Sequence, residues 1–263
     1  MLLTTLAEPL FELVNAHGKG LGLFATRSIT RGTRIIEEAP LLAVPPRKGL
    51  ELNMTHFETA LRALNHEKYA KVFELHRGHK VALPKVLPSQ QPSGALSRGN
   101  ILEAAAIFGT NSVAMGEGGE YGSGVFEHYS RINHACNPNV HNSYNPTMKK
   151  LTVHAVRQIN KGEEIVTSYI AATCRTRQQR QQLLGNWGIE CGCKCCIGPR
   201  AAESESRRSK MFEMDQQLAL YDKKIRLPGF RTPSSPRAAL EVCEELLELY
   251  RSESITDFSL SLL

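Results

Sequence analysis

Long hydrophobic runs are missing from this 263-residue chain, and cysteine is missing from its first half. No apolar run approaches the roughly 20 residues needed to cross a bilayer, and residues 1–10 lack the basic start of a secretory signal. We therefore expect an intracellular protein, in the nucleus or the cytoplasm, with no membrane partner. Because no cysteine precedes Cys136, a cysteine-based metal site is excluded from the first half of the chain.

Basic residues are in excess, but they are not concentrated. The formal net charge is +6, and the basic clusters at residues 175–180 and 207–210 are short. Such short runs favour solvated helix faces over a nucleic-acid site. A chromatin-bound adaptor that uses these segments is therefore a minor hypothesis.

Four of the seven cysteines lie within residues 191–196. In a reducing compartment this density favours metal thiolates over disulfides. The lone Cys136 far upstream suggests a zinc site that holds two distant parts of the fold together. The two remaining cysteines, Cys174 and Cys243, are predicted to be small buried apolar residues.

Short strands are predicted where apolar or alternating segments end at glycine or proline, at residues 10–14, 22–25, 34–42 and 151–156. Residues 27–36 resemble residues 157–166, with a glycine at Gly32 and at Gly162 between two apolar strand patterns. Each copy therefore predicts a tight turn that needs positive φ at the glycine.

Helices are predicted in the middle and at the end of the chain. Thr55 and Glu58 form a capping-box pattern that starts a helical insert. A loop over residues 84–100, a helix over 101–108 and a linker over 199–210 follow. Ser235 and Pro236 begin a last helix, whose predicted apolar face is Leu240, Cys243, Leu247 and Tyr250.

The glycine-rich segment at residues 18–22 is no dinucleotide fingerprint, because Leu23 begins another strand and no helix follows. Closely spaced glycines let a small ligand approach the backbone directly. The plain alternative is a hairpin turn between two strands.

Six motifs occur in a fixed order: Gly18-Lys-Gly-Leu-Gly-Leu-Phe-Ala25, Ile29 with Gly32, Glu38-Ala-Pro-Leu-Leu42, Ser130-Arg-Ile-Asn-His-Ala-Cys-Asn-Pro-Asn139, Gly162-Glu-Glu-Ile-Val-Thr-Ser-Tyr-Ile170 and the cysteine cluster. Together they resemble the SET-domain protein lysine methyltransferases, in the branch whose post-SET segment is like that of the SET-and-MYND proteins. The resemblance covers about residues 10 to 198. The MYND insert itself is absent, because it would need cysteines before Cys136.

The resemblance implies a mixed α+β, mainly β, SET fold of several short-stranded sheets, with a pseudoknot formed by the strand of Asn133 and a later segment. It implies an N-terminal SET part at 1–44, a helical insert at 45–98, a SET core at 99–170, a zinc-binding post-SET segment at 171–198, and a linker with a short helical tail at 199–263.

The resemblance also implies residue roles. Tyr169 would be the catalytic residue. The cofactor S-adenosylmethionine would be bound by Lys19, Gly20, Leu21, Gly22, Asn111, Asn133, His134, Tyr169, Trp187 and Ile189. Relatives usually carry an aromatic residue where this chain has Ile189, so Trp187 would take over contact with the adenine, or adenine binding would be weaker.

The spacing Cys-x-Cys-x-x-Cys selects Cys191, Cys193 and Cys196 as zinc ligands, and the resemblance adds Cys136 as the fourth. Four thiolates make a closed, structural Zn²⁺ site with no position open for catalysis. Cys195 is the alternative to Cys196.

The implied activity is S-adenosylmethionine-dependent protein-lysine N-methylation, by a monomer, of a histone or non-histone lysine. Histone or chromatin recognition follows from the family alone. Ile189 and the missing insert motivate a different reading, a catalytically inactive, zinc-stabilised SET interaction module associated with chromatin.

Overall fold

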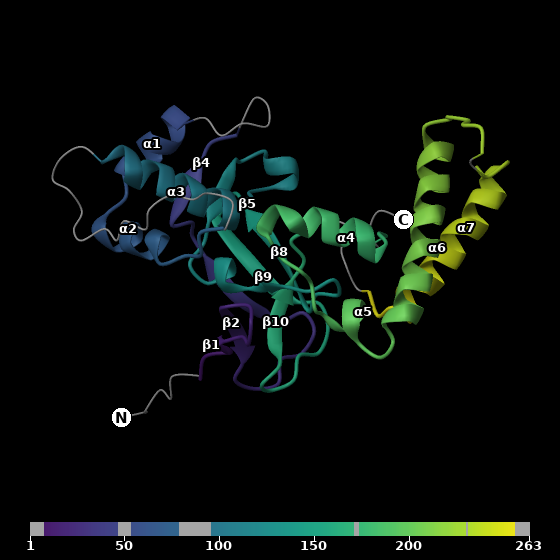
Figure 1. Cartoon of the computed structure of the whole chain (residues 1–263), viewed down its shortest axis with the longest axis horizontal. Helices are drawn as coiled ribbons and strands as arrows, with labels where there is room; N and C mark the ends of the chain where they lie inside the picture. The colour runs from purple at the N-terminus through teal and green to yellow at the C-terminus, as the bar shows by residue number, and fades with distance from the viewer. Residues whose placement is uncertain (1–7, 47–53, 79–95, 171–173, 230, 256–263) are drawn as a thin grey trace. The chain divides into compact units, whose positions relative to one another are not determined.

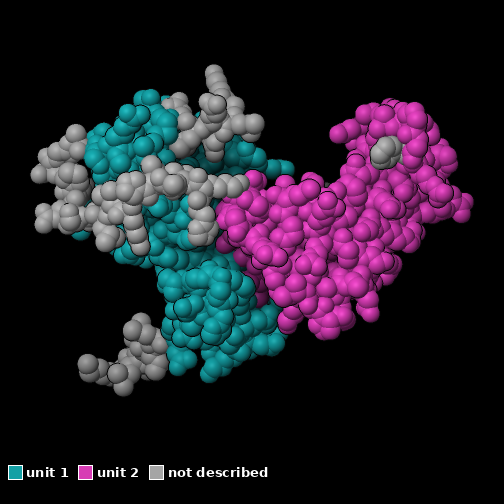
Figure 2. All heavy atoms as spheres, in the orientation of Figure 1, with its two compact units in different colours: residues 1–133, 140–165 teal, residues 134–139, 166–263 magenta. Residues whose placement is uncertain are grey.

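The computed structural model describes residues 8–46, 54–78, 96–170, 174–229 and 231–255 (Figure 1). The chain divides into two compact units. Unit 1 comprises Met1–Asn133 and Val140–Ile165, and unit 2 comprises His134–Asn139 and Val166–Leu263 (Figure 2). No helix in the described ranges is both long and apolar enough to cross a membrane.

In the described part of the chain, ten short strands form three small sheets. The four-stranded sheet has the order β1 (Phe11–Asn15), β2 (Leu21–Ala25), β10 (Glu164–Thr167), β7 (Asn133–His134). The first three-stranded sheet has the order β3 (Arg34–Glu38), β9 (Lys150–Ala155), β8 (Val140–Asn145). The second has the order β4 (Leu42–Val44), β6 (Ser123–Val125), β5 (Val113–Ala114). Short 3₁₀ turns lie at Glu117–Gly119, Tyr129–Arg131 and Gly185–Trp187.

Alternation of side chains explains how these strands build the core of unit 1. In β9, Leu151, Val153 and Ala155 are buried while the residues between them are partly exposed, as the two-residue period of a strand requires. These residues pack in one apolar cluster with Leu23 and Ile165. The predicted strands at 10–14, 22–25, 34–42 and 151–156 all correspond to observed strands, although 34–42 is divided between β3 and β4.

The two similar sequence segments pair with each other. Ile29 and Ile159 form an antiparallel bridge, with both N–H···O distances at 2.9 Å. Both side chains are buried in the core of unit 1. The repeat in the sequence therefore has a structural counterpart within one unit.

The glycine of each repeat occupies the predicted turn. Gly32 and Gly162 have φ of 85° and 77°, a region that side chains with a Cβ rarely enter. The Gly32 N–H donates to the Ala155 carbonyl, and the Gly162 N–H donates to the Ala25 carbonyl, both at 2.7 Å. The prediction of two tight turns is confirmed.

Three helices of unit 1 cover a second apolar cluster. They are α1 (Met54–Arg62), α2 (His66–Phe73) and α3 (Arg98–Asn111), and the rings of Phe57 and Phe108 meet edge to face at 5.5 Å. The predicted cap at Thr55 is wrong, because α1 already includes Met54 and the Thr55 carbonyl accepts a bond from Thr59 within the helix. The loop predicted over 84–100 is wrong at its end, where α3 begins; residues 84–95 lie outside the described ranges.

Unit 2 is built mainly of helices: α4 (Arg177–Leu184), α5 (Lys194–Ile197), α6 (Ala201–Asp222) and α7 (Pro236–Ser252). The linker predicted over 199–210 is wrong, because α6 occupies that segment. Helices α6 and α7 lie side by side (Figure 1) and bury Met211, Met214, Leu246 and Tyr250. Leu240, predicted on the apolar face of α7, is 58% exposed.

The prediction of a mixed α+β fold with several small sheets is confirmed. Helices make up about 41% of the described residues and strands about 20%, so the balance lies further toward helix than expected. The segment after β7 lies beside β10, since the Ala135 N–H donates to the Thr167 carbonyl at 2.9 Å. This is the pairing that a pseudoknot of these two segments requires.

Candidate functional site

The glycine-rich turn lies between β1 and β2 of unit 1. Gly18 and Gly20 have φ of 77° and 78°, and the turn is closed by the Ala16 N–H, which donates to the Gly20 carbonyl at 2.7 Å. The Lys19 ammonium lies 2.6 Å from the Glu164 carboxylate of β10. The turn is therefore a fixed loop whose backbone conformation depends on glycine.

Asn133 is held against this turn by its side-chain amide. The Asn133 Nδ2 donates to the Glu164 carboxylate at 2.9 Å and to the Leu21 carbonyl at 3.3 Å. A Cβ on Gly22 would lie 2.7 Å from that nitrogen, so glycine is needed there for close approach. Glu164 joins Lys19 to Asn133, a role that was not predicted from the sequence.

His134 lies at the start of unit 2 and is buried, with 6% of its surface exposed. Its Nδ1 accepts a hydrogen bond from the backbone N–H of Tyr169 at 3.1 Å, which places the proton of a neutral ring on Nε2. That Nε2 lies 3.5 Å from the Cys136 sulfur. One imidazole thus connects the Tyr169 backbone to the cysteine cluster.

Tyr169 lies between two other rings. Its ring centroid is 5.5 Å from that of His134 and 5.8 Å from that of Trp187, which lies in the 3₁₀ turn after α4. Tyr169, Trp187 and Ile189 all pack against the buried cysteines. The residues predicted around the cofactor in unit 2 therefore share one small cluster.

Four cysteine sulfurs converge in unit 2. The Sγ atoms of Cys136, Cys191, Cys193 and Cys196 all lie within 4.8 Å of one another. Cys136 is 3.7 Å from Cys191 and 3.6 Å from Cys196, and Cys193 is 3.9 Å from Cys196. These separations are too long for disulfides, whose S–S bond is about 2.05 Å.

The separations fit a tetrahedral metal site. Zinc–sulfur bonds of about 2.3 Å in a regular tetrahedron place neighbouring sulfurs about 3.8 Å apart. The donor set is four thiols, which suits Zn²⁺ and leaves no open position. Hydrogen bonds from Cys136 and Cys191 lower the pKa of the Cys196 thiol to about 6, so a thiolate is available to a metal at neutral pH.

The other cysteines lie outside this group. Cys195 contacts Arg208, with its sulfur 3.9 Å from the guanidinium, so the structure groups Cys196 and not Cys195 with the other three. The Cys174 sulfur lies 2.7 Å from the Tyr250 hydroxyl. Cys174 and Cys243 are partly exposed, so their predicted full burial is wrong.

Arg180 and Arg208 come from the two basic clusters predicted to be solvated, and they are 1% and 0% exposed. The prediction of solvated helix faces is wrong for both residues. Burial lowers the pKa of Arg180, but the nearby charge of Cys136 and a hydrogen bond to Cys196 raise it overall. Buried arginines cannot bind nucleic-acid phosphates, so these two residues do not support the chromatin-adaptor hypothesis, whereas Arg177 and Lys210 of the same clusters are exposed.

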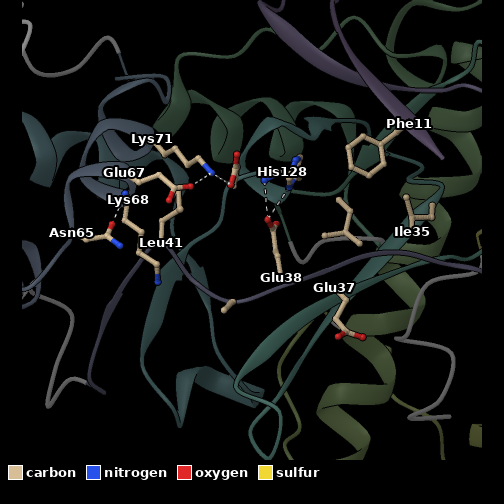
Figure 3. A pocket seen from close by; sticks show the side chains of 13 residues that line it. Phe11, Ile35, Glu37, Glu38, Leu41, Asn65, Glu67, Lys68, Lys71 and His128 are labelled. Carbon is tan, nitrogen blue, oxygen red and sulfur yellow. Dashed lines mark hydrogen bonds and ion pairs between the residues drawn. The ribbon is translucent and has the colours of Figure 1, made fainter. Parts of the chain in front are cut away.

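A separate pocket of about 450 Å³ lies in unit 1 (Figure 3). Five of its charged side chains pair with one another: the Lys71 ammonium lies 2.9 Å from both Glu67 and Glu127, and His128 lies 3.2 Å from Glu38. None of the site residues predicted from the sequence lines it. We therefore place the candidate chemistry elsewhere.

A protein-family model described as SET domain matches residues 20–170, more than half of the chain. The chain belongs to the SET-domain family. This confirms the family resemblance on which the residue assignments depend.

Curated relatives extend the match beyond the SET domain. Histone-lysine N-methyltransferase set5 of Schizosaccharomyces pombe is 28% identical over 244 residues, which cover 93% of this chain and 66% of that protein. N-lysine methyltransferase SMYD2-A of Danio rerio is 31% identical over 138 residues, which cover 48% of this chain and 31% of that protein. The chain thus spans just under two thirds of the first relative and about a third of the second.

The predicted residues of the SET site are distributed over both units. Lys19, Gly20, Leu21, Gly22, Asn111 and Asn133 belong to unit 1; His134, Tyr169, Trp187, Ile189 and the four cysteines belong to unit 2. The Asn111 amide donates to the His76 and Ile107 carbonyls, both at 2.7 Å, so it already holds the end of α3. The cofactor and catalytic roles of these residues stay predictions.

Proposed function

We propose that this SET-domain chain transfers a methyl group from S-adenosylmethionine to the side-chain amine of a lysine in a protein. The observation that carries the proposal is the hydrogen bond from the Tyr169 backbone to His134. It fixes the predicted catalytic tyrosine against the Asn-His motif. The names of the two relatives support a histone or another protein as the substrate, and we propose action in the nucleus or the cytoplasm.

The reaction is a displacement by a neutral amine. A free lysine has a pKa near 10.4, so the substrate must lose its proton before it reacts. When bound, S-adenosylmethionine supplies the methyl group and a sulfonium charge. The half-buried Tyr169 excludes water on one side, and its hydroxyl is the group we assign to orient the amine. Dry surroundings also favour the neutral amine over the ammonium.

The backbone of the glycine-rich turn and Asn133 are assigned to cofactor binding in unit 1. Their support is geometric: Gly22 leaves room for the Asn133 amide, and Glu164 orients that amide. In unit 2, Trp187 is assigned to the adenine, because this chain has Ile189 where relatives usually carry an aromatic residue. The Trp187 ring already lies beside the Tyr169 ring, tilted by 48° with the centroids 5.8 Å apart, which supports this assignment.

Zinc is assigned to Cys136, Cys191, Cys193 and Cys196. A metal there would join the segment after β7 to the segment that carries Trp187 and Ile189. Its role is structural, because four thiolates fill the coordination sphere. The support is the match between the sulfur separations and a zinc–thiolate tetrahedron.

The test is transfer of labelled methyl from S-adenosylmethionine to proteins of a cell extract. We compare the natural chain with Tyr169→Phe, and we use Tyr121→Phe, at an exposed tyrosine, as the matched control. We expect label on lysines of specific proteins, unchanged in the control and about 100-fold weaker in Tyr169→Phe, the typical effect of removing one positioned active-site donor.

Two other results would contradict parts of this proposal. Equal labelling by Tyr169→Phe would remove the catalytic role of that hydroxyl. No labelling by any of the three chains, with zinc still bound, would favour the inactive interaction module.

A further inference from the structure

Two fully buried guanidinium groups flank the cysteine group of unit 2. Arg180 comes from α4 and Arg208 from α6, and neither is more than 1% exposed. Burying a cation away from water is unfavourable unless an anion and hydrogen bonds compensate it. Their surroundings must therefore supply negative charge.

Arg180 has a carboxylate partner that is distant and partly exposed. Its Nη2 lies 3.8 Å from the Cys196 sulfur, and its Nη1 donates to the Arg175 carbonyl at 2.5 Å. Its Nε has no hydrogen-bond partner among the described residues. The Glu205 carboxylate is 3.9 Å away and one third exposed, so the nearest buried group that can carry negative charge is a metal-ligand sulfur.

Arg208 connects the cysteine group to the end of α7. Its Nη2 donates to the Cys136 carbonyl at 3.2 Å, and its Nε donates to the Glu253 carboxylate at 3.2 Å. Glu253 is shared, because Arg207 and Ser204 both donate to it at 2.6 Å. Arg207 and Arg208 thus share one carboxylate, which leaves one positive charge of this pair to be balanced by the cysteines.

The charges of this group balance when a zinc ion is bound. Four thiolates and one Zn²⁺ carry a net charge of −2, and Arg180 and Arg208 together carry +2. We propose that Arg180 and Arg208 are the buried counter-charges of the zinc–thiolate centre, and that Arg208 thereby makes the packing of α6 and α7 depend on bound metal. This inference rests on the zinc site of the proposed function.

The first measurement is the rate at which zinc passes from the purified chain to a chelator. We expect Arg180→Met and Arg208→Met to lose zinc about 10 to 100 times faster, the usual effect of removing a group that supports metal ligands. Arg180→Lys keeps the charge and is expected to stay within about threefold of the natural chain. Arg237→Met, at a side chain that is 92% exposed, is the control and is expected to show no change.

The second measurement separates charge from packing. We compare the melting temperatures of the same variants with zinc bound and after zinc removal. Arg208→Met also breaks the ion pair with Glu253, so it is expected to lower the melting temperature in both states. If the guanidinium groups balance the zinc–thiolate centre, both methionine variants are expected to lose more melting temperature with zinc bound than after zinc removal.

The outcomes are distinct. A natural chain that takes up no zinc would overturn the zinc site itself and, with it, this inference. If the chain binds zinc but the methionine variants release it like Arg237→Met, or melt earlier by the same amount with and without metal, the counter-charge role alone is overturned.

Discussion

At the residue scale, His128 makes the stability of unit 1 depend on pH. Its Nδ1 lies 3.2 Å from the Glu38 carboxylate, which also accepts the backbone N–H groups of His128 and Tyr129. The hydrogen bond to Glu38 raises the pKa of His128 above its ordinary value of 6.5. A raised pKa means that the folded chain holds the proton more tightly than the unfolded chain does.

We therefore expect the contribution of His128 to the free energy of unfolding to be complete below pH 6.5 and to disappear as pH rises through the raised pKa. The His128 side chain is 45% exposed, so screening by solvent limits the contribution to about 0.5 kcal/mol. Chemical denaturation of the natural chain and His128→Gln from pH 5.5 to 8.5 measures it. His66→Gln, at an exposed histidine, is the control, and a difference that grows with pH would contradict the assignment.

Some residues of the candidate site could be predicted from the sequence and others could not. The spacing of the cysteines is local, so Cys191, Cys193 and Cys196 could be selected directly. Glu164 and Arg208 could not, because their importance comes from partners far away in the chain, at Lys19 and Asn133 for the first and at Cys136 for the second. Periodicity does not indicate when a charged side chain is buried.

At the element scale, the start of α7 depends on one hydroxyl. The Ser235 Oγ accepts the Ala238 N–H at 3.2 Å, and Pro236 occupies the first turn. We expect Ser235→Ala to lower the free energy of unfolding by about 1 kcal/mol, the usual effect of removing an N-cap. Chemical denaturation measures the loss, and Ser234→Ala is the control; equal stability of the two variants would show that the cap contributes nothing.

Helices α6 and α7 differ in how far the sequence predicts them. Helix α7 has a cap signal and an amphipathic pattern, so its start at Pro236 was predictable. Helix α6 buries Ser204 and Arg208 beside Met211, so its inward face is not a regular apolar stripe. The Glu and Arg runs of residues 199–210 favour a linker in the sequence, because buried polar residues leave no regular hydrophobic period there.

At the scale of the whole molecule, metal removal should affect the two units differently. The described residues of unit 1 form two apolar clusters without cysteine, whereas one of the two clusters of unit 2 is formed around the cysteines. We expect chelation to raise amide exchange at least tenfold at residues 134–139 and 174–198, because zinc binding is coupled to folding. Exchange within β9 should change by less than about twofold.

Amide exchange is measured by mass spectrometry. Two substitutions accompany the experiment with the chelator. Cys136→Ser is expected to reproduce the effect of the chelator without any chelator present. Cys243→Ser, outside the cysteine group, is expected to exchange like the natural chain. Uniform loss of protection in both units would contradict separate stabilisation.

The pairing of residues far apart in the sequence, as in the bridge between Ile29 and Ile159, also matters during synthesis of the chain. Strands β2 and β3 leave the ribosome early, but their partners β10 and β9 are translated more than a hundred codons later. Contacts so distant along the chain form slowly, and until then the apolar faces of the early strands stay uncovered. A nascent chain that stops before residue 150 therefore cannot complete either of these sheets, and it would leave the ribosome as a substrate for chaperones.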